Sequence, residues 1–257
     1  MAVRTLCSAL SACVLAAGSV LAAGSADAGT PLPERLAHVG RSRLVIVVQA
    51  DSTHTRDATI EGWKKDTSGQ WHRFLDPRDA NVGAAGLVPA DERVQGDLRT
   101  PMGTFTLTRA FGTRADPGTA LPYKRLDDND YWAGDQADPA TYNLFQHRHP
   151  STARWRTSES ERLASYTPAY HYAVNIDFNL PRDLYVAGNG ERQAREPADV
   201  RRGAAIFLHA YSTSGAEGAT AGCVAMEEGA LGRVLDRLDP DLRPKIVIGT
   251  TSSITRM

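Results

Sequence analysis

Two residues near the end of the chain, His209 and Cys223, have the side chains of a nucleophilic site. Cys223 lies fourteen residues after His209 and is the only cysteine beyond residue 28. In an exported protein a lone thiol cannot form an internal disulfide, so it needs another reason to be there. A thiol attacks as the thiolate, and a neighbouring imidazole can take its proton. The pair predicts a cysteine acyl-transfer site with Cys223 as nucleophile and His209 as base.

The residues around this pair suggest how a substrate would be held. Gly222 permits a sharp turn in which the amides of Gly222 and Cys223 face a developing oxyanion. Arg99 is a candidate ligand for a substrate carboxylate, because guanidinium binds carboxylates with two parallel hydrogen bonds. Thr220 and Tyr211, on the loop between His209 and Cys223, are further candidate substrate contacts. A buried, inert cysteine is the alternative for a thiol considered alone.

The elements that must position these residues are mostly strands. Apolar runs at 44–48 and 204–208 predict buried strands, and the second delivers His209. Residues 58–63 and 71–75 predict a hairpin, and residues 245–249 predict a closing strand. Apolar residues at 231, 234, 235 and 238 recur at helical spacing, which predicts an amphipathic helix after the cysteine.

Two further segments, 104–108 and 172–179, alternate polar and apolar residues and predict half-buried strands. In the second, Asn175 and Asp177 should face solvent or a cleft. Residues 110–162 between them lack a clear period, so we expect a long irregular insertion with at most one short helix. Many strands with one or two short helices predict a mainly β fold built from packed, mixed sheets.

The first residues predict export. Arg4, an apolar stretch at 6–23 and Ala26-Asp27-Ala28 describe a signal peptide over residues 1–28. We expect a spacer at 29–43, one catalytic domain at 44–250, a tail at 251–257 and a secreted or cell-wall location. Residues 10–13 imitate a lipoprotein cleavage box, but the apolar region before Cys13 is short, so a lipid anchor there is not expected. No transmembrane anchor is expected either.

Other functions find little support in the sequence. The net charge of −1 gives no long-range attraction to nucleic acid. His147, His149 and His171 do not have zinc-ligand spacing, and the acidic run at 127–130 lacks the glycine and distal glutamate of a calcium loop. We therefore expect no metal and no cofactor.

Several motifs resemble those of one enzyme family. Ile206-Phe207-Leu208-His209 and Thr220-Ala221-Gly222-Cys223-Val224-Ala225-Met226 resemble the signature of the L,D-transpeptidase catalytic domain of the YkuD or ErfK type. The stretch 96–105 is similar to that family's Gly-Asp-x-x-Thr-Pro-x-Gly-x-Phe motif, and 127–128, 142–143 and 170–179 fall where one branch has similar residues. The resemblance covers about 44–249.

This resemblance implies a β-sandwich-like fold of mixed sheets and a reaction on peptidoglycan stem peptides. Cys223 would attack a tetrapeptide stem at its L-to-D linkage, releasing D-alanine and leaving a thioester that an amine or water resolves. The outcome is a crosslink or a trimmed stem, and carbapenem-type inhibitors would acylate the same sulfur.

The sequence also departs from the family pattern. Many members have Ser-His-Gly-Cys followed by Arg or Asn two residues later, whereas this chain has Ala221 and Ala225. Two alternatives therefore stay open: a wall-binding protein that keeps the fold without the chemistry, and a cysteine peptidase or amidase that uses the same pair.

Overall fold

The computed structural model describes residues 1, 29–212 and 218–257, and Pro31–Met257 form one compact unit. The predicted signal peptide at 1–28, apart from Met1, lies outside the described residues. Within the described part of the chain, no helix is long and apolar enough to cross a lipid bilayer.

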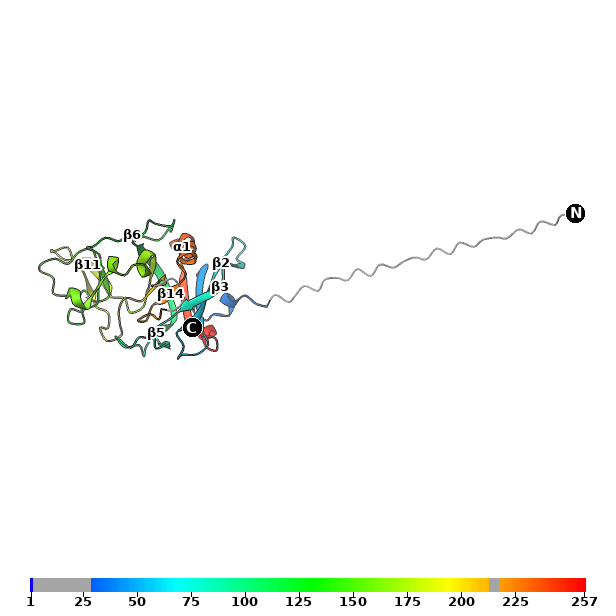
Figure 1. Ribbon diagram of the computed structural model, residues 1–257, viewed down its shortest axis with the longest axis horizontal. Helices are drawn as coiled ribbons and strands as arrows, with labels where there is room; N and C mark the ends of the chain where they lie inside the picture. Colours follow the sequence, from blue (N-terminus) through cyan, green and yellow to red (C-terminus); the bar gives the residue numbers. More distant parts are fainter. Residues whose placement is uncertain (2–28, 213–217) are drawn as a thin grey trace. The chain divides into compact units, whose positions relative to one another are not determined.

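A large mixed sheet that closes on itself forms the centre of the fold (Figure 1). Strand β10 pairs with both β13 and β5, so the order β10-β13-β14-β3-β2-β1-β15-β5 returns to its start. The pairs β1–β15 and β13–β14 are parallel, and most of the others are antiparallel. The strands of this sheet are β1 (Leu44–Ala50), β2 (Asp57–Lys65), β3 (Trp71–Asn81), β4 (Leu87–Pro89), β5 (Thr100–Gly112), β6 (Tyr123–Arg125), β10 (Ala173–Ile176), β13 (Phe207–Ala210), β14 (Val224–Met226) and β15 (Lys245–Thr250).

The described chain is thus mainly β with one α-helix, as predicted. The helix, α1 (Glu228–Arg237), begins where the Glu227 side chain accepts hydrogen bonds from the amides of Gly229 and Ala230. Its apolar residues Leu231, Val234 and Leu235 are buried in the main core. The helix follows β14 after one residue, so its packing holds the end of that strand in place.

Strand β1 explains why its sequence lacks alternation. Ile46 and its neighbours on the same face are buried in the main core. Val45 and Val47, on the other face, join a second cluster with Trp63 and Trp71. Both faces are therefore covered, as the continuous apolar run predicted.

The ends of the domain correct two expectations. Residues 29–43 were expected to be a spacer, yet they contain a 3-10 helix, η1 (Leu32–Arg35), and Leu36 and Val39 are buried in the second cluster. The expected tail at 251–257 contains η6 (Ile254–Arg256), and the Ala37 amide donates to the Thr255 carbonyl at 3.0 Å. The two segments cover the outer face of β1, because Val45 and Val47 would otherwise be exposed to water.

The insertion at 110–162 is also more regular than expected. It holds β6, β7 (Tyr131–Ala133), β8 (Leu144–Gln146), η2 (Thr157–Glu159) and β9 (Glu161–Arg162), and β8-β7-β9 form a small sheet. Trp132 of β7 packs edge-on against Phe207 of β13 at 4.8 Å between ring centroids. The insertion is thereby anchored to the strand that carries His209.

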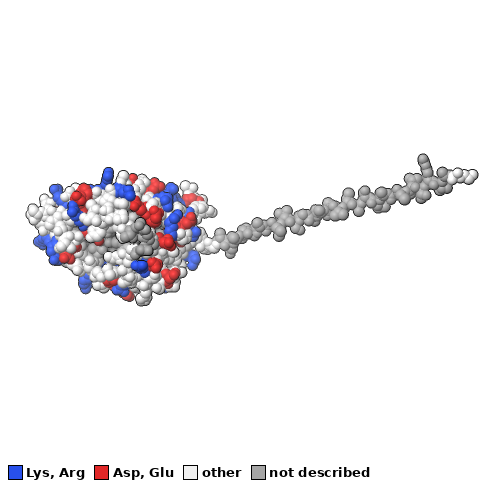
Figure 2. Space-filling view, in the orientation of Figure 1, with Lys and Arg blue, Asp and Glu red and all other residues white. Residues whose placement is uncertain are grey.

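Elsewhere, β11 (Arg182–Val186) and β12 (Arg192–Glu196) form a hairpin, and η3 (Leu163–Ser165), η4 (Ala169–His171) and η5 (Pro240–Leu242) are short turns. Asn175 and Asp177 each line a cleft, as expected, and Asn175 is buried there and donates to Asp177 Oδ1 at 2.7 Å. Pairing on both edges leaves β10 little contact with solvent. On the face shown in Figure 2, acidic and basic side chains are interspersed, in keeping with the net charge of −1.

Replacing Ile46 by alanine should lower the free energy of unfolding by about 2–5 kcal/mol, because a fully buried side chain would leave a cavity in the main core. Chemical denaturation measures this change. Val186→Ala is the matched control, because Val186 is 69% exposed, and its effect should stay within about 0.5 kcal/mol. Equal losses in the two variants would contradict the assignment of the core.

Candidate active site

His209 lies on β13, and Cys223 lies next to the start of the parallel neighbouring strand, β14. His209 is opposite Ala225, and Cys223 immediately precedes β14, where its sulfur accepts a hydrogen bond from the Phe207 amide at 3.4 Å. Side chains two residues apart on a strand point to the same face, so the thiol, Ala225 and the imidazole share one face. Both functional side chains line a cavity of about 310 Å³. One detail of the prediction was wrong: the strand begins at Phe207, not Ala204, and His209 lies within it.

A strained bend beneath the sulfur orients the thiol. Cys223 Sγ donates to the Ala205 carbonyl at 3.3 Å, and Ala205 has the left-handed φ of 57° that a residue with a Cβ seldom adopts. The Ala205 amide donates to Asn143 Oδ1 at 3.0 Å, and Trp132 Nε1 donates to the same oxygen at 2.8 Å. Asn143 is buried, so the insertion holds the bend from below.

The turn before the cysteine needs glycine and is closed by two threonines. Gly222 has a φ of 136°, and a Cβ there would lie 2.9 Å from Arg93 Nη2 and 3.0 Å from the Arg99 carbonyl. The Cys223 carbonyl accepts from Thr220 Oγ1 at 2.7 Å and from Thr100 Oγ1 at 3.1 Å. The Gly222 amide donates to Thr220 Oγ1 at 3.2 Å, so it would have to leave this partner to bind an oxyanion.

The hydrogen bonding of His209 frees one ring nitrogen. Nδ1 lies 2.6 Å from the Ala210 carbonyl, which can only accept, so Nδ1 carries the proton and Nε2 keeps a lone pair. Burial lowers the pKa of His209 to about 4, although the bond to Ala210 opposes this shift. The imidazole is therefore neutral at neutral pH.

The thiol is also neutral at rest. Burial, and to a smaller extent the Glu161 carboxylate, raise the pKa of Cys223 to about 12, although the Phe207 amide and the Arg93 guanidinium oppose this rise. An uncharged thiol beside an uncharged imidazole can still react, provided that the proton moves to Nε2 as the sulfur attacks.

Arg93 is a residue that the sequence analysis missed. It is only 4% exposed and lines the same cavity. Its Nη1 lies 3.6 Å from Asp97 Oδ1 and donates to the Arg202 carbonyl at 3.3 Å. Burial lowers the pKa of Arg93, and the charge of Asp97 opposes this. The sequence held one signal, since Arg93 comes just before the Gly96-Asp97 motif, but only the fold brings it to Gly222.

Of the three predicted substrate contacts, the structure brings one to the cavity. Thr220 lines it, but its hydroxyl is used within the turn. The Arg99 guanidinium instead binds Asp97 Oδ2, through Nε and Nη2 at 3.2 Å each. Tyr211 donates to the Asp79 carbonyl at 2.7 Å. Neither Arg99 nor Tyr211 belongs to the described lining of the cavity.

Another wall of the cavity comes from the end of the insertion and the segment that follows it. Tyr166, Tyr170 and Glu161 line the cavity. The Tyr170 ring packs edge-on against the His209 ring, with centroids 5.5 Å apart, and its hydroxyl donates to Glu161 Oε2 at 2.7 Å. The sequence analysis did not single out Glu161, because nothing in its local sequence marks it.

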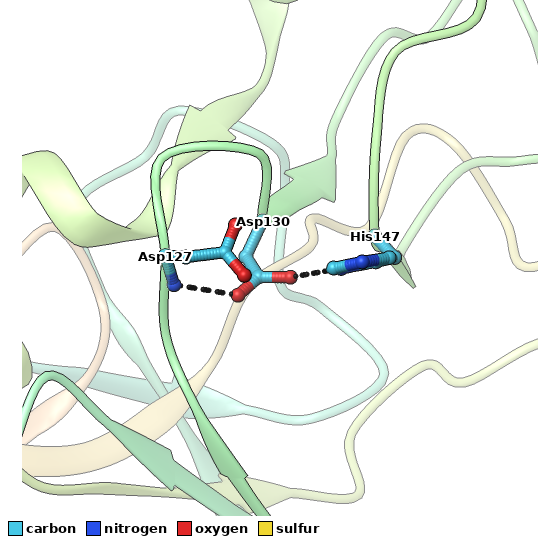
Figure 3. Close-up of side chains that lie close together, drawn as sticks. All are labelled: Asp127, Asp130 and His147. Atoms are coloured by element: carbon cyan, nitrogen blue, oxygen red, sulfur yellow. Dashed lines mark hydrogen bonds and ion pairs between the residues drawn. The ribbon is translucent and has the colours of Figure 1, made fainter.

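One cluster away from this cavity has the side chains of a metal site (Figure 3). Asp127, Asp130 and His147 lie close together, and His147 Nδ1 is 2.8 Å from Asp130 Oδ1. The Lys124 ammonium lies 3.2 Å from a carboxylate oxygen of each aspartate. Since Lys124 already supplies a positive charge, the cluster is explained without a metal.

A thiol and an imidazole on one face of a closed sheet, inside one cavity, are suited to acyl transfer through the cysteine. The family model of the L,D-transpeptidase catalytic domain (YkuD) matches residues 45–248, and the chain belongs to this family. No curated protein and no solved structure matches the chain.

Gly222→Ala should lower the free energy of unfolding by about 1–3 kcal/mol, because the new Cβ meets Arg93 and the Arg99 carbonyl at a φ that favours glycine. Thermal and chemical denaturation measure the change. Gly188→Ala is the matched control, since no atom lies within 4 Å of a Cβ built at Gly188. If Gly222→Ala were as stable as this control, the turn geometry described above would be wrong.

The burial of His209 predicts a loss of stability in acid. The pKa of His209 is about 4 in the folded protein and 6.5 ordinarily. Between these pH values the unfolded chain binds a proton at this imidazole and the folded protein does not. The contribution of the neutral imidazole to the free energy of unfolding is complete above pH 6.5 and falls by about 3 kcal/mol as the pH drops to 4. Chemical denaturation of wild type and His209→Gln across this pH range measures the contribution, as the difference between the two curves of unfolding free energy against pH. Parallel curves would show that His209 titrates normally.

Proposed function

We propose that this protein is an exported L,D-transpeptidase that acylates Cys223 with peptidoglycan stem peptides and uses His209 as the base. The observation that carries the proposal is the shared cavity, into which the thiol and an imidazole with a free Nε2 project from paired parallel strands. Membership of the L,D-transpeptidase family supports the reaction class and the substrate. Export rests on the signal-peptide pattern at 1–28.

In the first half-reaction, the sulfur attacks the carbonyl carbon at the L-to-D linkage while its proton moves to His209 Nε2. The carbonyl electrons move to the oxygen, and we assign the amide of Cys223 as its principal hydrogen-bond donor, because the Gly222 amide is engaged by Thr220. The intermediate collapses, the carbon–nitrogen bond breaks, and the leaving amine of D-alanine takes the proton from Nε2. The thioester remains.

Arg93 contributes to this step through its charge. A thiolate and an oxyanion both place negative charge beside Gly222 and Cys223, and the guanidinium is next to Gly222 in a poorly solvated region. Electrostatic stabilisation is strong where water is excluded. Arg93 thereby offsets the rise in pKa that burial imposes on the thiol.

Many members have a histidine before Gly-Cys. In this chain two threonine hydroxyls would orient the nucleophile in its place. Ala221 has no polar side chain, yet Thr220 and Thr100 both donate to the Cys223 carbonyl. The nucleophile is therefore oriented through its backbone. Ala225, opposite His209, leaves room beside the imidazole.

Cys223→Ala should abolish the mass increase that a carbapenem or a tetrapeptide stem produces on the purified wild-type protein. The reason is that no other cysteine is present in the chain beyond residue 28. Intact-protein mass spectrometry measures the adduct, and chromatography of muropeptides measures crosslinked and trimmed products.

Three results would contradict a transpeptidase with Cys223 as its nucleophile. An unchanged adduct in Cys223→Ala would remove Cys223 as the nucleophile. Binding to purified wall without an adduct or new muropeptides would indicate a non-catalytic wall-binding protein. Faster turnover of casein than of wall fragments would indicate a cysteine peptidase.

A further inference from the structure

The wall of the active-site cavity contains a carboxylate that has no cationic partner among the described residues. Glu161 begins β9 at the edge of the small sheet, and it lines the cavity together with Cys223 and His209. Its one hydrogen bond within the described chain comes from the Tyr170 hydroxyl, at 2.7 Å to Oε2. Buried or half-buried acids are normally paired, because a carboxylate without water or a counter-charge is costly.

Three other buried acids are paired with a cation. Asp135 binds Arg156 at 2.8 Å, and Asp130 binds Lys124 at 3.2 Å. Glu61, on β2, binds Arg73 at 3.0 Å. Asp138 and Glu191 are also buried without one among the described residues, but neutral groups donate hydrogen bonds to them and neither belongs to the described lining of the cavity. None of the ion pairs in the described residues includes Glu161, so this carboxylate has free acceptor capacity directed at the cavity.

The chemical state of Glu161 suits the binding of a cation. Burial raises its pKa to about 7, and the hydrogen bond from Tyr170 opposes this rise. A group with such a pKa can exist as the carboxylate when a cation is present and can also hold a proton. A water molecule is neutral and gains nothing from the charge of Glu161, and the carboxylate would repel an anionic ligand. A primary amine, which is an ammonium ion in water, fits the site.

We propose that Glu161, positioned by Tyr170, forms the subsite that receives the amine of the acceptor in the second half-reaction. The inference rests on the proposed function and extends it, because it assigns the acceptor side of the reaction to a particular wall of the cavity. Tyr170 connects the subsite to the base, since its ring packs against His209 while its hydroxyl holds Glu161.

The second half-reaction moves two protons from the acceptor nitrogen, the first to Glu161 and the second to His209. The acceptor ammonium gives one proton to the Glu161 carboxylate, and the neutral amine forms a carbon–nitrogen bond at the thioester carbonyl. His209 Nε2 takes a second proton from that nitrogen. The carbon–sulfur bond breaks, the sulfur leaves with the electron pair, and Nε2 returns its proton to Cys223. Glu161 then releases its own proton to water.

The first test measures how the acyl-enzyme divides between aminolysis and hydrolysis. Tetrapeptide stem serves as donor, stem peptide with a free amine as acceptor, and chromatography gives the ratio of crosslinked to trimmed product. Both products come from one acyl-enzyme, so the ratio is independent of acylation rate. Glu161→Gln should lower the ratio at least about tenfold, and Tyr170→Phe should lower it less.

Glu159→Gln is the matched control. Glu159 lies two residues away in η2, its side chain is 50% exposed and 3.9 Å from Arg156, and it is absent from the cavity lining. Its ratio should equal that of wild type. An unchanged ratio in Glu161→Gln, or equal losses in Glu161→Gln and Glu159→Gln, would overturn the subsite.

A second test does not require catalysis. In Cys223→Ala protein, calorimetry compares the acceptor peptide with the same peptide acetylated on its amine. We expect the free amine to bind at least about tenfold more tightly, and the preference to vanish in Cys223→Ala/Glu161→Gln. Equal binding of the two peptides to Cys223→Ala would overturn the subsite. If Cys223→Ala protein prefers the free amine but the wild-type protein forms no acyl-enzyme, the proposed transpeptidase activity is wrong and the amine subsite is still supported.

Discussion

The parallel pairing of β13 with β14 is the constraint on which the site depends. It sets His209 opposite Ala225 and brings Cys223 beside Phe207, so the imidazole and the thiol emerge on the same face. Side chains alternate along a strand, so a slip of one residue would send one of the two to the opposite face. The register is held from both ends: the amide of Phe207 and the bend at Ala205 contact the sulfur, and α1 packs into the core directly after β14.

Burial then decides the electrostatics of the pair. The cavity excludes enough water that both groups are uncharged at rest, with pKa values of about 4 for His209 and about 12 for Cys223. Under such conditions any nearby charge counts for more than it would in water. Arg93 and Glu161 are the two charged side chains that act on the sulfur from the cavity wall, and they act in opposite directions.

The insertion at 110–162 contributes residues directly to the candidate site. Asn143, immediately before β8, accepts hydrogen bonds from the Ala205 amide and from Trp132 Nε1 at the same side-chain oxygen. The final strand of the insertion begins with Glu161, and Tyr170 after it reaches both Glu161 and His209. A segment whose sequence has no clear period thus supports the Ala205 bend that contacts Cys223 and supplies one wall of the cavity.

Local patterns in the sequence determined the mainly β fold, the buried strand at 44–48 and the helix after the cysteine, and they marked Cys223 and His209 as candidate site residues. Those features depend on residue type and short spacing, which a sequence displays directly. The tertiary structure alone decided that residues 29–43 and 251–257 pack on the domain, that the guanidinium of Arg93 rather than that of Arg99 lies beside Gly222, and that Glu161 faces the cavity. Each of these depends on contacts between residues far apart in the chain, and the direction of a side chain across such a contact follows from packing and register, which no local pattern encodes.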